Sequence, residues 1–152
     1  MLYLTRLLRS LIVVILGLWL TACGTATVKM KLVASSRLNQ DAQGASLPVF
    51  IRVYTLNSPE DFTDASFATL WHQDKAALAN SLISRQELSI NPHSMVQLKI
   101  PLTTETHYFA VLALFRHPYA GKWRVWGKLP SRFAAPLTEI QLKLQGRKLS
   151  RS

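Results

Sequence analysis

The stretch Leu20-Thr21-Ala22-Cys23 determines which part of this chain can fold as a domain. Two arginines and then ten uncharged residues, 11–20, lead into small side chains and the only cysteine of the sequence. This order is typical of a bacterial signal peptide, residues 1–22, that ends in a lipobox formed by Leu20, Thr21 and Ala22. We therefore expect cleavage before Cys23, with diacylglycerol on its sulfur and a fatty acyl group such as palmitate on its nitrogen.

Two other interpretations of this leader are an uncleaved membrane helix and an ordinary signal peptide with an incidental cysteine. A spanning helix needs about 20 predominantly apolar residues. The uncharged stretch runs from Ser10 to Val28, but beyond Leu20 it consists mainly of Thr, Gly and Ala. The lipobox is therefore the preferred interpretation.

Removal of the 22-residue leader from the 152-residue chain leaves 130 residues, enough for one domain with its own core. We expect a lipidated tether over residues 23–26 and a single domain over 27–152. Once Cys23 is lipidated, no thiol remains for a disulfide or for a cysteine-ligated metal.

Basic residues outnumber acidic ones throughout the mature chain. The sequence has 18 Lys and Arg against 8 Asp and Glu, and only Arg6 and Arg9 are lost with the leader. The cations are dispersed, and a secreted, membrane-tethered protein rarely meets nucleic acid. Anionic lipid headgroups, lipopolysaccharide or an acidic protein surface are better candidate neighbours, although charge dispersed in this way is most often only a solvated surface.

Alternating hydrophobicity predicts a chain rich in strands. Val28, Met30 and Leu32 alternate with Lys29 and Lys31, as in a half-buried strand. Further strands are predicted over 49–56, 87–90, 95–100, 108–115, 123–129 and 137–144. About seven strands with short turns favour a β-sandwich, and the basic end 145–152 is expected to fray.

A helical insertion is predicted over about 59–82. Ser58-Pro59-Glu60-Asp61 is a strong helix start, with the Ser58 hydroxyl expected to accept from the N–H of residue 61. Downstream, five apolar side chains fall near one helical face, and Asp74 is a candidate cap for a second short helix. These apolar residues are Phe67, Leu70, Trp71, Leu78 and Leu82.

The segment between the first two predicted strands, 34–47, is polar and unusually long for a compact domain. Long loops are often functional, so this loop is a candidate binding site.

Nothing in the sequence has the pattern of a catalytic site, and we expect no enzyme, no metal and no cofactor. The histidines at 72, 93, 107 and 117 lack paired ligand spacing, and no G-x-S-x-G motif is present. An aromatic cluster around Tyr119, Trp123 and Trp126 leaves open an alternative, in which an envelope lipoprotein binds a ligand, glycan or peptidoglycan. Trp123 and Trp126 differ by three positions, so at most one of them should be exposed beside Tyr119.

The order of these motifs resembles the TssJ (VasD/Lip) family, the outer-membrane lipoproteins of type VI secretion systems. The lipobox and first strand are followed by the loop Leu38-Asn39-Gln40-Asp41 with Gly44. The second strand, 48–56, the helical segment 62–70, Pro92, the strand 108–116 and Trp123-Arg124 complete the ordered set. The family often has Asn-Pro-Asp where this chain has Asn39-Gln40-Asp41, which predicts a less rigid loop.

The resemblance implies a transthyretin-like sandwich of seven to eight strands with small helices, on the periplasmic face of the outer membrane. Its implied partner is the periplasmic C-terminal domain of TssM, and through it the TssL/TssM membrane complex. The implied contact is the loop 37–47, and Gly24 after Cys23 fits release to the outer membrane. Within this loop, Leu38 and Leu47 would be apolar contacts and Asn39, Gln40 and Asp41 would form hydrogen bonds, with Arg37 and Gly44 completing the site.

Overall fold

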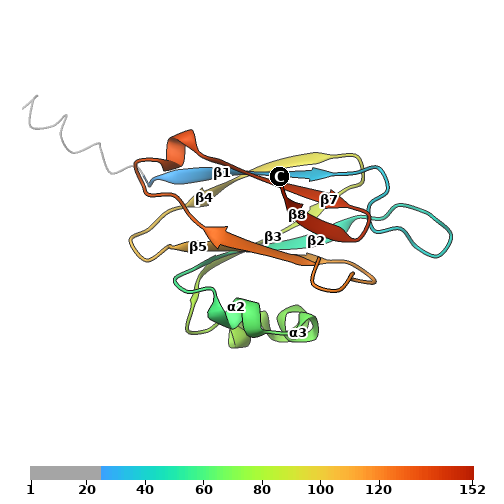
Figure 1. Cartoon of the computed structure of the whole chain (residues 1–152), viewed down its shortest axis with the longest axis horizontal. Helices are drawn as coiled ribbons and strands as arrows, with labels where there is room; N and C mark the ends of the chain where they lie inside the picture. Colours follow the sequence, from blue (N-terminus) through green and yellow to red (C-terminus); the bar gives the residue numbers. More distant parts are fainter. Residues whose placement is uncertain (1–24) are drawn as a thin grey trace, which may run out of the picture.

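The computed structural model describes residues 25–152, so the leader, the lipobox and Cys23 lie outside the described residues. Eight strands form two sheets packed face to face, and two short helices lie against the outside of one sheet (Figure 1). The strands are β1 (Thr27–Ala34), β2 (Val49–Leu56), β3 (Leu82–Ile90), β4 (Met95–Pro101), β5 (Tyr108–Leu114), β6 (Arg124–Lys128), β7 (Glu139–Gln145) and β8 (Lys148–Arg151). This confirms the predicted β-sandwich. Over residues 25–152, no helix is long and apolar enough to cross a membrane.

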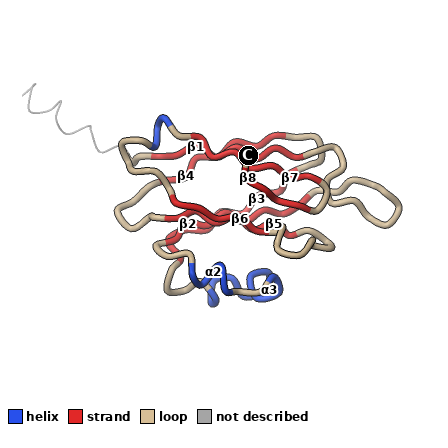
Figure 2. Tube along the Cα trace, viewed as in Figure 1, coloured by secondary structure: helices blue, strands red, loops and turns tan. Residues whose placement is uncertain are grey.

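Each sheet has four strands, and Figure 2 draws the strands of both layers in red. The first sheet has the order β4-β1-β7-β8, in which β1 and β7 run parallel and the other neighbours are antiparallel. The second sheet is antiparallel and has the order β3-β2-β5-β6. β1 begins two residues after Thr25, the first described residue, and ends at the 35–48 loop. We call the two ends of the sandwich the chain-entry end and the loop end accordingly.

Alternating side chains place the core between the sheets. Val28, Met30 and Leu32 of β1 are fully buried, as the sequence pattern predicts. β5 is buried on both faces except at its ends, because the helices cover the outer face of its sheet. This burial on both faces explains why the sequence of β5 is almost entirely apolar.

The helical insertion consists of α2 (Glu60–Asp64) and α3 (Phe67–Ala77). α3 begins with an effective cap, because the Ser66 hydroxyl accepts from the Thr69 N–H at 3.1 Å. The predicted cap on α2 is wrong: helix α2 begins one residue later than expected, and the Ser58 hydroxyl is 3.5 Å from the Glu60 nitrogen. The insertion is also shorter than predicted.

The end of the insertion differs from the sequence pattern in two details. α3 is kinked at Gln73, just before Asp74, so a second short helical segment does begin there. Leu78 lies at the C-terminal end of α3, whereas Leu82 is already the first residue of β3. The five apolar residues predicted to share one helical face therefore lie on a kinked helix, at its C-terminal end and at the start of a strand.

An ionic network fastens α3 to the second sheet. The Asp74 carboxylate accepts hydrogen bonds from the Tyr54 hydroxyl at 2.8 Å and from Arg85 Nε at 2.7 Å. Arg52 donates to the backbone oxygens of Leu70 and Trp71, each at 2.9 Å. Glu87 accepts from both arginines at 2.8 Å.

This network shifts the titration of its members. Burial alone would raise the pKa of Asp74, but hydrogen bonds from Arg85 and Tyr54 and the charge of Arg52 outweigh it, so the pKa lies below 3.8. Burial and the neighbouring carboxylate raise the pKa of Tyr54. Asp74 is therefore a buried anion at neutral pH, paired on two sides.

The predicted fraying of the basic C-terminal residues is wrong. Gly146, at a φ of 59°, allows a tight turn into β8, which pairs antiparallel with β7. Leu149 of β8 is buried in the core opposite Leu144. One inward-facing leucine and one turn glycine suffice to order this segment despite its charge.

Candidate partner-binding loop

The β1–β2 loop, residues 35–48, projects farther from the end of the sandwich than the neighbouring loops do (Figure 1). Backbone hydrogen bonds join its two limbs: at the base the Leu47 N–H donates to the Leu38 oxygen at 3.0 Å, and in the tip the Asp41 N–H donates to the Ala45 oxygen at 3.0 Å. The predicted position of the loop is therefore confirmed, and its two limbs run together as a narrow finger.

Two of the residues predicted to contact a partner instead form the base of the loop. Leu38 is fully buried in the core, and Asn39 is only 3% exposed. Their predicted roles as direct apolar and hydrogen-bonding contacts are therefore wrong for this conformation. Leu47 is partly exposed beside them.

Asn39 connects three loops at this end of the sandwich. Its Nδ2 donates to the Pro48 oxygen at 3.1 Å, and its Oδ1 accepts from the Arg116 N–H at 3.0 Å. Its own backbone N–H donates to the Gly146 oxygen at 2.8 Å, in the β7–β8 turn. Asn39 has a φ of 47°, a left-handed conformation that asparagine tolerates better than most residues. The side chain of Asn39 thus joins the β1–β2 and β5–β6 connections, and its backbone N–H adds the β7–β8 turn.

The tip, residues 40–46, is exposed but internally hydrogen-bonded. The Asp41 carboxylate accepts from the backbone N–H groups of Gln43 and Ala45 at 3.0 and 2.8 Å. Gln40 Nε2 donates to the Gly44 oxygen at 2.9 Å, and Gly44 has the positive φ of 84° that the turn requires. A hydrogen-bonded turn therefore forms although Gln40 stands where the family often has proline. The prediction of a less rigid loop remains a prediction.

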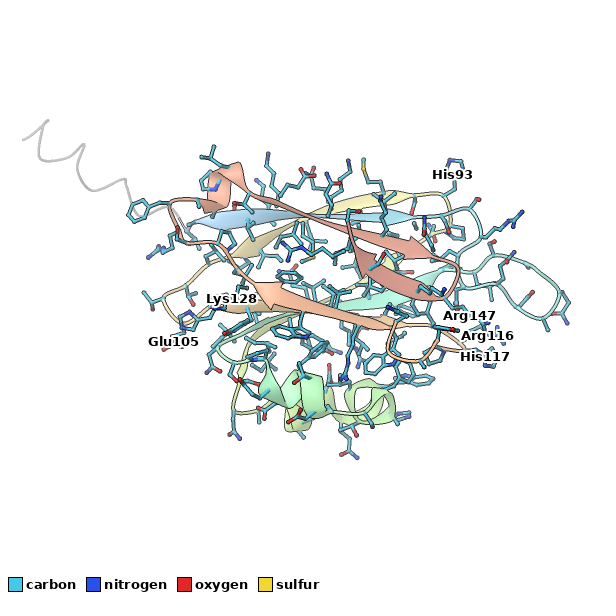
Figure 3. The ribbon with its side chains drawn as sticks, viewed as in Figure 1. His93, Glu105, Arg116, His117, Lys128 and Arg147 are labelled. Atoms are coloured by element: carbon cyan, nitrogen blue, oxygen red, sulfur yellow. The ribbon has the colours of Figure 1, made fainter. Side chains whose placement is uncertain are left out.

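Three arginines surround the base of this loop. Arg116 comes from the β5–β6 connection and Arg147 from the β7–β8 turn, and both lie at the loop end with His117 beside Arg116 (Figure 3). Arg37, within the loop itself, is the third exposed arginine. Among residues 25–152, no carboxylate is paired with Arg37, Arg116 or Arg147. The loop therefore protrudes from a surface of positive potential.

A scan of residues 26–147 against protein-family models matches the family described as type VI secretion lipoprotein, VasD, EvfM, TssJ. The chain belongs to this family of type VI secretion lipoproteins. No curated protein matches the chain at the level of sequence.

Solved structures share the fold of this type VI secretion lipoprotein. Serratia marcescens Lip, a membrane-bound component of the type VI secretion system, has a TM-score of 0.75 at 22% identity, covering 83% of this chain and 96% of Lip. The lipoprotein TssJ1 from Pseudomonas aeruginosa has a TM-score of 0.72 at 20% identity, covering 85% and 96%. A chain in a structure described as the TssM C-terminal domain from EAEC has a TM-score of 0.72 at 24% identity, covering 83% and 100%.

The aromatic cluster that supported a sugar-binding alternative is divided in this lipoprotein. Trp123 is buried and packs edge-on against Phe67, with ring centroids 5.2 Å apart, whereas Trp126 is exposed. This confirms that at most one tryptophan can lie beside Tyr119. The four histidines are all exposed, and within the described part of the chain no group of His, Cys, Asp and Glu could hold a metal ion.

Sequence reasoning missed the role of Asn39 and the convergence of Arg116 and Arg147 on the loop. Arg116 and Arg147 lie far from the loop in sequence, and only the sheet order brings them to it. A signal for the backbone of Asn39 did exist, because asparagine is one of the residues that tolerate a left-handed conformation in loops.

Proposed function

We propose that this type VI secretion lipoprotein is held at the periplasmic face of the outer membrane by lipid on Cys23. There it binds the periplasmic C-terminal domain of TssM through the tip of the β1–β2 loop. By doing so it would help to nucleate the membrane complex that contains TssM and TssL. The protein would act as a tether and not as an enzyme.

The observation that carries this proposal is the placement of the loop relative to the start of the domain. The first described residue, Thr25, is two residues from Cys23, and β1 leads from there directly to the loop (Figure 1). Eight residues of strand extend about 26 Å. A lipid on Cys23 would therefore hold one end of the sandwich at the membrane while the loop points away from it.

The tip offers the partner a preformed surface. Its hydrogen-bonded turn reduces the conformational entropy that would otherwise be lost on binding. Restriction to a membrane raises the effective concentration of the loop near a membrane-spanning partner, so a modest interface suffices. The surrounding arginines favour an acidic surface on the partner and would accelerate its encounter.

The direct test replaces residues 41–45 by Asn-Gly, which closes the finger with a two-residue turn and leaves Leu38, Asn39 and Leu47 in place. We expect capture of a TssM periplasmic fragment to fall at least tenfold while the melting temperature stays within about 2 °C of the parent. The matched control is Glu105→Ala in the β4–β5 loop at the opposite end, which should capture normally. Undiminished capture by the shortened loop would move the binding site elsewhere.

A further inference from the structure

The most exposed large apolar side chains of the described residues lie at the end of the sandwich opposite the loop. Phe133 is 96% exposed and Leu137 is 92% exposed, whereas the other exposed large apolar residues range from 36% to 60%. Both side chains belong to the connection between β6 and β7. Two nearly fully exposed apolar groups four residues apart need a physical reason.

This connection lies beside the point where the chain enters the domain. The 3-10 turn η2 (Ala135–Leu137) immediately precedes β7 and contacts β1, and the parallel pairing sets Lys29 beside Glu139. The turn is the orange-red coil next to the blue start of β1 in Figure 1. On the other side of β1, the Leu102 N–H donates to the Ala26 oxygen at 2.8 Å.

The exposure of these side chains is enforced by the local structure. The N–H groups of Ala134 and Ala135 both donate to the Ser131 oxygen at 3.0 Å, and the Thr138 hydroxyl donates to the Ala134 oxygen at 2.8 Å. Ala135 is fully buried and fixes the turn to the core. The turn is therefore held in place while Phe133 and Leu137 point outward.

Polar and basic groups flank the two apolar side chains. A cavity of about 480 Å³ lies beside them and is lined by Thr103, Thr106, Lys128, Ser131 and Arg132, among other residues. Lys128 and Arg132 are exposed. Glu105 lies near Lys128 at this end of the sandwich (Figure 3), and Glu139 begins β7, just after the turn. Hydroxyls and two cations around a cavity suit a phosphate-bearing headgroup better than a neutral ligand.

We infer that Phe133 and Leu137 insert into the membrane interface, with Lys128 and Arg132 contacting phosphate headgroups of the same leaflet. The inference rests on the proposed lipidation of Cys23, because two residues of chain limit the Cα of Cys23 to about 7 Å from that of Thr25. Exposed apolar groups beside basic ones are the composition of interfacial membrane contacts.

This second contact would set the orientation of the domain on the membrane. A lipid anchor followed by a short tether leaves the sandwich free to tilt. Insertion of the β6–β7 turn beside the anchor would align β1 with the membrane normal and hold the loop away from the lipid.

The test measures membrane depth, because the anchor on Cys23 would mask any change in overall membrane retention. Leu137→Cys is spin-labelled in the lipidated protein, reconstituted into vesicles of phosphatidylethanolamine and phosphatidylglycerol. The matched control is Trp71→Cys on α3, which is also exposed but lies on the helical side of the sandwich. Accessibility to oxygen, which concentrates in lipid, is compared with accessibility to a water-soluble nickel chelate.

We expect the label at position 137 to favour oxygen several-fold over the chelate, and the label at position 71 to show the reverse. Equal chelate accessibility at both positions would overturn the inference while leaving the lipid anchor intact. Protection at position 137 from both reagents would indicate a protein contact and would also overturn it. Protein that does not enter the vesicle fraction at all would contradict the proposed anchor instead, and Phe133→Cys provides a second label site.

Discussion

The two ends of β1 carry opposite kinds of surface. At the loop end, Leu38 is buried and the side chain of Asn39 forms its hydrogen bonds within the protein. Arginines surround the hydrogen-bonded loop that projects from this end. At the chain-entry end, Phe133 and Leu137 are almost completely exposed beside a polar cavity. This difference is the one that the proposed membrane contact at one end and the proposed partner contact at the other require.

The largest effect should follow from removal of the anchor. In Cys23→Ser the thiol that would accept the lipid is absent, so we expect a protein that is soluble or retains its uncleaved leader, is missing from the outer membrane and does not support complex assembly. Metabolic palmitate labelling and fractionation of the envelope measure this, with the unsubstituted chain as control. Outer-membrane fractionation of the serine variant would contradict the anchor at this end.

The next effect separates the base of the loop from its tip. Leu38→Ala removes a fully buried side chain and should lower the free energy of unfolding by about 2–5 kcal/mol. Gln43→Ala, at the exposed tip, should change it by less than about 0.5 kcal/mol. Urea denaturation of both variants checks this, and a similar cost for both would show that base and tip are not distinct.

A smaller effect tests whether α3 is fastened independently of both ends. Asp74→Asn removes the charge that Arg85 and Tyr54 contact and should lower the free energy of unfolding by about 2 kcal/mol at neutral pH. Because the folded state depresses the pKa of Asp74, its contribution is present above about pH 4 and is lost as the pH falls through the lowered value.

Melting temperatures of the parent and Asp74→Asn between about pH 7 and pH 3 give the readout. The two curves should draw together toward pH 3, because the unfolded parent binds a proton on this carboxyl group at a higher pH than the folded parent does. A constant difference across this range would assign the cost of the substitution to altered packing.

The smallest effect concerns the cations around the loop. Arg147→Glu should slow association with a TssM periplasmic fragment by roughly two- to fivefold at low salt, because it reverses a charge near the proposed contact. The difference should shrink as salt screens the charges. Stopped-flow or biosensor kinetics would measure it, with Lys143→Glu on the exposed face of the first sheet as control. An equal effect of both substitutions would indicate non-specific attraction.

The strand-rich fold could be predicted because period-two patterns such as Val28, Met30 and Leu32 encode burial directly. β8 was harder to predict, because Leu149 is its only buried apolar residue and its neighbours are basic or polar. The predicted helical face extended too far for a related reason: apolar spacing alone does not show that the helix ends at Ala77 and that Leu82 already belongs to β3.

The candidate site was predicted as a segment but not as a set of contacts. The length and polarity of residues 34–47 identified the loop. Whether Leu38 and Asn39 face a partner or the core depends on the β5–β6 and β7–β8 connections, which reach the loop only through the sheet order. Long-range assembly of this kind leaves no local pattern in the sequence.

The most direct test of the difference between the two ends is photo-crosslinking in cells. A photoreactive amino acid is placed at Ala42, on the exposed loop tip, and in a second strain at Leu137, beside the chain entry. We predict that position 42 crosslinks to TssM and that position 137 does not. Crosslinking of TssM from position 137, with none from position 42, would contradict the account.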